Sequence, residues 1–519
     1  MEPQRPRSGR ALGLTALATV LPGSGLTRTR SRRLGWVLLV VTLGALAVAA
    51  RSVLTRGVTA TALEIVSHPE LMGPAALAIA AWGLVWCASI VLTAVEARPR
   101  GLGGGRTLVL AAFTTAMVGA IGSGTYLAVD YALITRDTVG AVFSAPTPRP
   151  GTGPRVTAEV GPSTSPDADP WAGQPRLNVL LIGSDAGADR VGIRTDSMIV
   201  ASLDTRSGRT TLISLPRNLL DAPLAPNSPL RARYPSGHFG QPDRACAQNT
   251  PGVTGQCQLT NLYAEAEAYA VDHPGAYAPG IVPGREEVRG AVQQIVGLPI
   301  DHVVVIDLRG FPLLVDAMGG LDINVKDAGT GGPLPIGGHV TADNRVVGVT
   351  GWFRPGRQHL DGQHALWYAR SRAADNDDYR QARQRCVVRA IVEQVDPLAM
   401  LREYPRLARI ARDNIYIDIP VQSLPAMALL AERAQRAPVD SVSLTLGDGI
   451  RPWSPDYARI RALVRRGITA STTPDASRPA SPPPTTPVAQ PTPRPTPHPT
   501  PHPTPSPTPS PTTTPYAQC

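Results

Sequence analysis

Three long apolar stretches near the amino terminus constrain this chain more than any other feature of its sequence. They cover residues 34–54, 74–95 and 107–129, and each contains about 20 residues. A helix of about 20 apolar residues spans the ~30 Å hydrocarbon layer of a bilayer. Three such stretches in a row are unusual for the core of a soluble protein, so we predict three transmembrane helices.

A fourth apolar stretch, residues 11–25, is shorter and is interrupted by Pro22 and Gly23. We interpret it either as an interfacial segment or as half of a re-entrant hairpin. It does not fit a cleavable signal peptide, because further spans follow it and no small-residue cleavage site is evident.

Arginine placement predicts how these helices cross the membrane. Residues 1–33 and the loop at residues 96–106 are rich in arginine, whereas Arg56 is the only arginine between the first two spans. Cytoplasmic loops of membrane proteins carry an excess of positive charge. We therefore expect the amino terminus and the 96–106 loop in the cytoplasm, and everything after Val129 outside the cell.

Composition predicts the order of the remaining segments. Residues 137–175 are rich in Pro, Gly, Ser and Thr, which indicates an extended linker. The last 49 residues hold 18 of the chain's 54 prolines, which indicates a solvated polyproline tail. We expect a basic cytoplasmic segment over residues 1–33, transmembrane helices over 34–136, a linker over 137–175, a globular domain over 176–470 and a disordered tail over 471–519.

Strand and helix patterns alternate within the globular region. The predicted strands cover residues 177–183, 197–204, 210–216, 300–308 and 415–419, and the second and third of them form an antiparallel hairpin. The predicted helices cover residues 285–297, 379–395, 397–411 and 420–434. This alternation is typical of an α/β domain with a mixed central sheet flanked by helices.

Two cysteines flank a polar, turn-rich loop. Cys246 and Cys257 enclose the sequence AQNTPGVTGQ, and no histidine lies among them at a spacing that would suit a metal. A local disulfide is therefore favoured over a zinc site, provided that the compartment is oxidising.

Charged residues gather at the ends of the predicted strands. Asp185 and Asp196 lie beside apolar strands, and Mg²⁺ is often held by one or two carboxylates together with water and substrate phosphate oxygens. Arginine offers permanently charged, bidentate donors to phosphate. The arginines that we expect to serve this purpose are Arg194, Arg217, Arg370 and Arg372.

The sequence YARSRAADNDDYRQARQR, residues 368–385, holds the densest cluster of charge. Arg370 and Arg372, two residues apart, would point the same way from a strand. Asp377, Arg380, Arg383 and Gln384 fall near one face of a helix. The alternative for residues 377–385 taken alone is a solvated helix with i,i+3 ion pairs, and we interpret Arg385 as solvated.

Several sequence words bring these residues together in one family pattern. The words NVLLIGSD, RTDSMIVASLD, TTLISLPRN, LPIDHVVVIDLRGFPLLVDAMGGLDINV, HLDGQHALWYARSR and DDYRQARQRC follow one another across about residues 177–395. As an ordered set they resemble the LytR–CpsA–Psr family.

The resemblance implies an enzyme that attaches lipid-carried glycans to the cell wall. A peptidoglycan hydroxyl would attack a polyprenyl-pyrophosphate sugar, so that the glycan phosphate is transferred and polyprenyl phosphate leaves. The implied partners are the lipid-linked glycan, peptidoglycan and membrane lipid, and not nucleic acid. An apolar tunnel for the polyprenyl chain is implied too, although we interpret VVVIDL and FPLLVDAM as ordinary core.

The resemblance also implies a role for each candidate residue. Mg²⁺ or Mn²⁺ would be positioned on the pyrophosphate by Asp185 and Asp196. The pyrophosphate oxygens would be bound by Arg217, Arg370 and Arg372, with Arg194, Asp377, Arg380 and Gln384 completing the pocket. Of these, the residues expected to be catalytic are Arg217, Arg370, Arg372 and Asp377.

One departure from the family pattern keeps alternatives open. The chain has Pro216-Arg217-Asn218 where the family usually has Pro-Arg-Asp, so activity or metal use is expected to change if that acid anchors the arginine or the metal. A hydrolase that uses water as the acceptor and a non-catalytic wall-binding scaffold are the alternatives. A transcriptional regulator is disfavoured, because the short cytoplasmic parts show no helix-turn-helix pattern.

Overall fold

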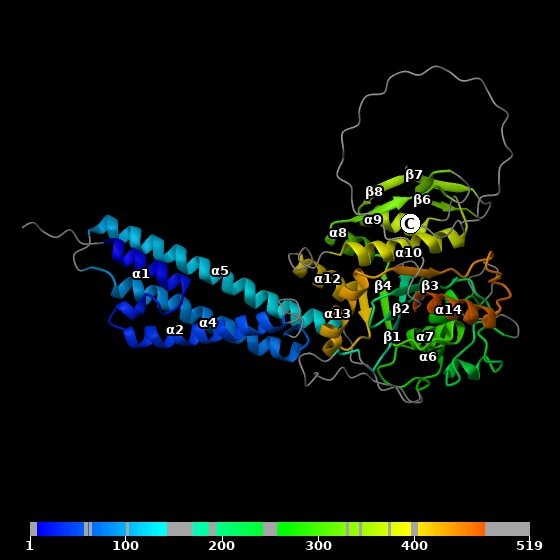
Figure 1. Cartoon of the computed structure of the whole chain (residues 1–519), viewed down its shortest axis with the longest axis horizontal. Coiled ribbons are helices and arrows are strands. Elements are labelled where there is room, and N and C mark those ends of the chain that lie inside the picture. The colour runs from blue at the N-terminus through cyan, green and yellow to red at the C-terminus, as the bar shows by residue number, and fades with distance from the viewer. Residues whose placement is uncertain are drawn as a thin grey trace, which may run out of the picture.

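The computed structural model describes residues 8–56, 61, 65–99, 103–142, 169–171, 173–185, 194–241, 257–328, 332–341, 345–371, 375–395 and 403–472. The helices before residue 143 form an elongated bundle, and the elements after residue 169 form an α/β domain at one end of it (Figure 1).

The three apolar stretches form three long helices, as predicted. These are α2 (Arg32–Arg56), α4 (Pro69–Glu96) and α5 (Gly104–Val142), and each is long and apolar enough to cross a membrane. Helix α5 continues past the predicted end at Val129 and includes residues that composition assigned to the linker. Its 39 residues give a length of about 58 Å, roughly twice the thickness of the hydrocarbon layer.

The short apolar stretch forms α1 (Ser8–Val20), which packs inside the bundle against α4 and α5. The indole N–H of Trp86 donates to the carbonyl of Ala18 at 3.0 Å. The chain then turns through η1 (Leu26–Arg28) and returns to Glu96 at the end of α4, whose carboxylate accepts from the backbone and hydroxyl of Ser31. Residues 11–25 therefore pack within the helical bundle, and whether they are re-entrant or interfacial in a membrane stays a prediction.

The α/β domain is built on a six-stranded sheet with the order β10-β3-β2-β1-β4-β9. The β1–β2, β2–β3 and β4–β9 pairs are antiparallel and the β1–β4 and β10–β3 pairs are parallel, which confirms the predicted mixed sheet and hairpin. The bounds are β1 Arg176–Asp185, β2 Arg194–Asp204, β3 Thr210–Ser214, β4 His302–Asp307, β9 Ile415–Ile417 and β10 Val439–Val442.

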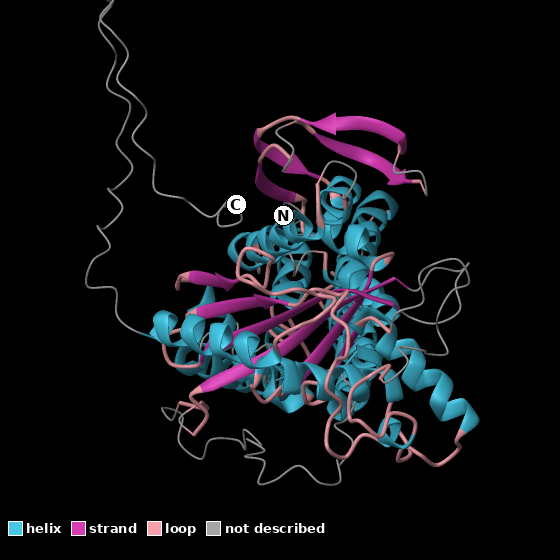
Figure 2. Ribbon diagram, turned by 90° about the vertical axis from the view of Figure 1, so that its right-hand side faces the viewer, coloured by secondary structure: helices cyan, strands magenta, loops and turns pink. Residues whose placement is uncertain are grey.

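Helices cover both faces of this sheet (Figure 2). Alternation along β2 turns Met198 and Val200 toward one layer and Ile199 and Ala201 toward the other. The first layer contains α6 (Leu262–Asp272), α7 (Pro283–Val296) and α14 (Tyr457–Thr472), and the second contains α10 (Asp377–Gln394) and α13 (Leu424–Gln435). Helix α7 ends at Gly297, whose φ of +71° is readily adopted only by glycine, as the sequence predicts.

A second, smaller core lies above α10. It joins α8 (Gly310–Ala317) and α9 (Gly362–Arg370) to two pairs of short strands. The pairs are β5 (Leu321–Val325) with β8 (Gly356–Leu360), and β6 (Leu334–Val340) with β7 (Val346–Phe353). Its buried members include Val315, Ile323, Phe353, Tyr368 and Val387. Short 3₁₀ turns occur at Pro229–Ala232, Leu259–Asn261 and Val421–Ser423.

The far end of α5 contacts the α/β domain directly. It packs against α12 (Tyr404–Asn414) and approaches β9 (Figure 1). Leu407 and Ile410 of α12 pack in turn on Ala317 of α8. The side of the domain formed by α8 and α12 therefore faces the helical bundle.

Candidate active site

An irregularity in the central hairpin positions the first candidate residue. Gly183 pairs with Ser197 and Ser184 pairs with Thr195, so Asp196 is the extra residue of a β-bulge. A bulge interrupts the strict alternation of side chains and is often found beside active sites. The loop after β3 lies next to β2, and it brings Arg217 to the bulged aspartate.

Arg217 lies between two carboxylates. Its Nη1 is 2.6 Å from Oδ1 of Asp196, and its Nε is 3.8 Å from Oδ1 of Asp377 at the start of α10. The same Asp377 oxygen is 2.7 Å from Nη2 of Arg380. The four side chains, all predicted site residues, therefore form one alternating cluster of charge. Arg217, Asp196 and Asp377 are each about one fifth exposed, so solvent or a ligand can reach the cluster.

Helix α10 is not a solvated helix, and the interpretation of Arg385 as solvated was wrong. Arg380, Arg383 and Arg385 are each 7% exposed or less. Arg385 donates to the hydroxyl of Ser443, and burial lowers the pKa of its guanidinium to about 10. The periodicity could not reveal this burial, because the smaller core and the segment after β10 cover α10 on sides that the sequence does not mark as apolar.

Arg383 has a structural role that sequence reasoning missed. Its guanidinium pairs with the fully buried carboxylate of Asp375, and it donates to the backbone carbonyls of Tyr368 and Ser371. These carbonyls flank Arg370, so Arg383 fixes the backbone that carries this predicted phosphate ligand. The spacing alone could not distinguish this inward-facing arginine from the site-facing residues of the helix.

Arg370 is the last residue of α9 and does not lie on a strand, which corrects the prediction that Arg370 and Arg372 extend from one strand. Asp361 caps this helix by accepting from the backbone N–H of His364 at 2.8 Å, and the DGQHALWYAR sequence has apolar residues at helical spacing. Arg372 lies outside the described residues, and its role stays a prediction.

An apolar pocket begins where the charged cluster ends. It has a cavity volume of about 120 Å³, and Arg370, Gln384 and Ser197 line it together with apolar side chains. Gln384 accepts from the Ser197 hydroxyl at 3.1 Å and its amide lies 3.5 Å from the Ala369 carbonyl. The apolar lining comes from the sheet, α8, α9 and α10 and includes Leu181, Ile199, Ile306, Leu308, Phe311, Leu366, Val387, Val388 and Ile391.

This lining corrects part of the sequence interpretation. Ile306, Leu308 and Phe311 belong to the words VVVIDL and FPLLVDAM, which were interpreted as ordinary core, yet they line the pocket. Val303 and Val315 of the same words are indeed buried in the two cores.

The remaining predicted residues are placed only in part. The backbone of Asp185 ends β1 and pairs with Arg194 at the start of β2, which lies two residues from the bulge, while the side chain of Asp185 is outside the described part. Cys257 is buried in the main core and forms no disulfide in this structure, so the predicted Cys246–Cys257 bridge is wrong here; Cys246 itself lies outside the described residues.

The donors at the cluster are oxygen atoms of the kind that Mg²⁺ prefers. Within the described ranges no group of three or more His, Cys, Asp or Glu side chains could hold a metal. Mg²⁺ needs fewer protein ligands than that, because it commonly keeps water and substrate phosphate oxygens. Near Asp196, the buried Oδ1 of Asn218 and Oγ1 of Thr195 have no hydrogen-bond partner in the part of the chain that is described. These residues fit such an ion.

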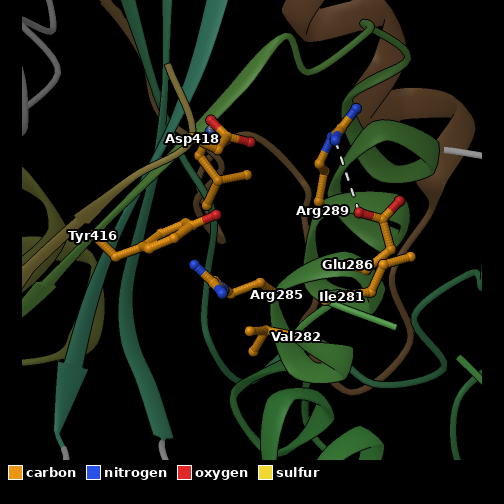
Figure 3. Close-up of a pocket in the computed structure, with 9 residues that line it drawn as sticks. Ile281, Val282, Arg285, Glu286, Arg289, Tyr416 and Asp418 are labelled. Atoms are coloured by element: carbon orange, nitrogen blue, oxygen red, sulfur yellow. Dashed lines mark hydrogen bonds and ion pairs between the residues drawn. The ribbon is translucent and has the colours of Figure 1, made fainter. Parts of the chain in front are cut away.

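A second arginine-containing pocket lies between α7 and β9 (Figure 3). Its cavity volume is about 30 Å³. The guanidinium carbon of Arg285 lies 3.2 Å from the ring centroid of Tyr416. Arg289 donates to the carbonyl of Ile300 and lies 3.7 Å from the Glu286 carboxylate. Here the arginines serve as packing and bonding partners of the protein itself.

Comparison with known proteins points to a single family. The polyisoprenyl-teichoic acid–peptidoglycan teichoic acid transferase TagU of Enterococcus faecalis is 28% identical over 258 residues, which cover 49% of this chain and 65% of that protein. TagV of Bacillus subtilis, with the same transferase name, is 23% identical over 49% of this chain and 52% of its own length. The cell wall biosynthesis protein LcpA of Corynebacterium glutamicum is 25% identical over 45% and 42%, respectively. The chain thus spans less than two thirds of each relative.

Solved structures of similar proteins include B. subtilis TagV and TagT bound to LI-WTA. Each is 19% identical with a TM-score of 0.36; the match covers 58% of this chain, and 98% and 92% of the respective structures. The sequence model of the LytR_cpsA_psr family matches residues 157–222 and 257–459. Because this match covers more than half of its residues, the chain belongs to the LytR_cpsA_psr family, as its sequence words predict.

Proposed function

We propose that this chain is a membrane-anchored phosphotransferase that moves a glycan phosphate from a polyprenyl-pyrophosphate carrier to peptidoglycan. The observation that carries this proposal is that a charged cluster, Arg217 with Asp196 and Asp377, adjoins an apolar pocket that Arg370 lines. The two are joined through Ser197, which follows Asp196 in β2 and whose hydroxyl donates to Gln384 of α10. A polyprenyl pyrophosphate has a matching shape, with an anionic head joined to a long apolar tail.

The arginines supply what phosphoryl transfer requires. The reaction depends mainly on positioning and on neutralising the charge of the phosphate oxygens. Arg217 and Arg370 neutralise the pyrophosphate, and Arg380 strengthens the positive field from behind Asp377. An acceptor hydroxyl attacks the phosphorus that carries the sugar, and the bond from that phosphorus to the bridging oxygen breaks. Polyprenyl phosphate leaves, and a carboxylate of the cluster takes the hydroxyl proton.

Asp196 and Asp377 keep Arg217 in place for this step. They approach its guanidinium from two different elements, β2 and α10, so the arginine is held before substrate arrives. Such preorganisation avoids the cost of reorienting charges during the reaction. Arg372 and Arg194 are proposed to complete the set of phosphate donors.

We also propose that Asp185 and Asp196 hold Mg²⁺ or Mn²⁺ with substrate phosphate oxygens. Such an ion, when bound, further neutralises the pyrophosphate. Asn218 adds a neutral amide oxygen where the family usually has a carboxylate, so we expect weaker metal affinity than an aspartate would give.

The apolar helices would place the site beside its lipid substrate. With the arginine-rich 96–106 loop in the cytoplasm, α5 extends beyond the outer surface of the membrane and contacts the α/β domain there. The α8 and α12 side of the domain faces the bundle, and Phe311 of α8 lines the apolar pocket. A polyprenyl chain could therefore pass from the bilayer to the pocket along this side.

Product analysis separates this proposal from its alternatives. The full chain in nanodiscs is incubated with a radiolabelled polyprenyl-pyrophosphate glycan, with and without peptidoglycan. Transfer of label to peptidoglycan is expected, together with release of polyprenyl phosphate. Release of a soluble glycan phosphate in both samples would indicate a hydrolase. Unchanged glycan attachment by the Arg370→Ala variant would indicate a non-catalytic scaffold.

A further inference from the structure

A well-ordered segment after β10, residues 443–456, bridges the two elements that carry the charged cluster. Its Ser443 hydroxyl accepts from Arg385 of α10 at 2.9 Å, and its Leu446 backbone lies beside Asp378 in the first turn of that helix. Its Pro452 carbonyl accepts from the backbone N–H of Leu220 at 2.9 Å, three residues after Arg217. One segment therefore contacts both the helix and the loop that meet at Arg217.

The segment is held rigidly in this position. Asp448 accepts from the hydroxyl and the backbone N–H of Thr445 at 2.6 and 3.1 Å, and its own carbonyl accepts from Arg459 at 2.7 Å. Leu444 and Ile450 are each 1% exposed and anchor the segment in the main core. It is therefore a fixed wall rather than a loose loop.

This wall and the apolar pocket lie toward opposite ends of α10. Asp378, which contacts the segment, is in the first turn, whereas Val388 and Ile391 of the pocket are in the last turns. Ten residues of helix separate Asp378 from Val388, a distance of about 15 Å along the axis. Asp377, Arg380 and Gln384 lie between them or at the edge of the wall.

The geometry of in-line phosphoryl transfer predicts which substrate binds at each end of α10. The attacking and leaving oxygens lie on opposite sides of the phosphorus. The leaving group is the polyprenyl phosphate, whose tail fits the apolar pocket at one end of α10. The acceptor must then approach from the other end, where the 443–456 segment stands. In Figure 1 this segment, in orange, lies on the side of the domain away from the transmembrane helices.

The exposed residues of the segment suit a carbohydrate. Trp453 is 54% exposed and Leu446 is 51% exposed. Sugar rings present a face of C–H groups with hydroxyls at the edge, and indole offers a large flat surface with a polar N–H. We propose that residues 443–456 form the acceptor-binding wall of the site and that Trp453 packs against a sugar ring of the peptidoglycan glycan strand. This inference rests on the proposed transferase function.

The test separates acceptor binding from donor chemistry. Full-length protein in nanodiscs receives a polyprenyl-pyrophosphate glycan and uncrosslinked peptidoglycan strands at increasing concentration. For Trp453→Ala we expect the acceptor KM to rise about tenfold, the size of effect that loss of one aromatic contact can produce. The KM for the donor should not change. Trp453→Phe should restore most of the acceptor affinity.

A matched control is present in the same domain. Trp352 on the β6–β7 hairpin is 55% exposed, nearly the same as Trp453, so Trp352→Ala removes an equally exposed indole. An unchanged acceptor KM in Trp453→Ala, or equal losses in the two alanine variants, would overturn the assignment of the wall. Wild-type protein that cleaves the donor but never labels peptidoglycan would instead overturn the proposed function, and the wall with it.

Discussion

Two pockets of this molecule contain arginine side chains, and they differ in what surrounds those arginines. In the pocket between α7 and β9, Arg285 covers the ring of Tyr416, and Arg289 is tied to a backbone carbonyl and near Glu286 (Figure 3). In the other, Arg370 stands at the rim of an apolar cavity, and its partner cluster around Arg217 is about one fifth exposed.

The difference shows why a count of arginines cannot locate a phosphate site. A guanidinium that packs on an aromatic ring is held by that contact and contributes to the stability of the fold. A guanidinium held by carboxylates at the mouth of an apolar cavity can bind an anion whose tail fills that cavity. The four changes below test this contrast, beginning with the largest expected effect.

Removal of the central cation should nearly abolish donor cleavage. We expect Arg217→Ala to lower kcat about 10³-fold, because loss of one preorganised charged donor typically costs two to three orders of magnitude. Release of polyprenyl phosphate measures the effect. Arg285→Ala in the second pocket is the control and should retain near wild-type activity; equal losses in both variants would break the contrast between the two pockets.

Loss of the buried ion pair between Arg383 and Asp375 should lower the stability of the fold. We expect Arg383→Met to lower the free energy of unfolding by about 4 kcal/mol, because it leaves the fully buried carboxylate of Asp375 unpaired. Urea unfolding of the full chain in nanodiscs measures this. Arg389→Met removes an exposed pair with Glu393 on the same helix and should cost less than about 1 kcal/mol. A loss of less than about 1 kcal/mol in the free energy of unfolding of Arg383→Met would contradict a structural role for this ion pair.

A buried carboxyl beside the second pocket should make stability depend on pH. Burial raises the pKa of Glu287 from 4.5 to about 7, although it accepts from Ser228 and Tyr277. The folded state then binds more protons than the unfolded state between these values, so the free energy of unfolding falls as pH rises from 4.5 to 7. The loss should amount to about 3 kcal/mol.

Glu287→Gln should remove this pH dependence, and thermal unfolding across the pH range measures it. The neighbouring Glu286→Gln, which changes a half-buried carboxylate, should leave the slope in place. An unchanged slope in Glu287→Gln would show that another group titrates. Neither variant is expected to change donor binding, since α7 lies on the opposite face of the sheet from the apolar pocket.

A bulky side chain in the apolar pocket should weaken binding of the lipid tail. We expect Val388→Trp to raise the KM for a long-chain polyprenyl-pyrophosphate donor about tenfold, because it fills space that the tail would occupy. A donor with a very short prenyl chain should be affected little. Arg389→Trp, on the exposed side of α10, is the control. Equal effects on both donors would argue against a lipid site.

The sequence predicted the elements of the fold well where one pattern determined them. The three apolar helices, the β2–β3 hairpin and the amphipathic α7 each follow a local periodicity. The spacing of Arg370 and Arg372 predicted a strand, whereas Arg370 is the last residue of α9. The spacing of the arginines does not take account of Asp361, which caps this helix. The length of α5 exceeded the prediction because a helix can continue after hydropathy falls.

The site was predictable mainly through the ordered family words. These words identified Asp196, Arg217, Asp377 and Arg380, which the structure brings together. The bulge at Asp196 depends on strand register, and the inward direction of Arg383 depends on helix packing. The spacing of residues in the sequence predicts neither. The pocket lining mixes residues from six elements, so no local pattern could separate it from ordinary core.

The most direct test of the central claim is a structure of the full chain with a polyprenyl-pyrophosphate glycan bound. We expect the pyrophosphate beside Arg217 and Arg370, with the polyprenyl chain running among Phe311, Val388 and Ile391. Pyrophosphate bound between Arg285 and Arg289, or a polyprenyl chain outside the apolar pocket, would contradict the account.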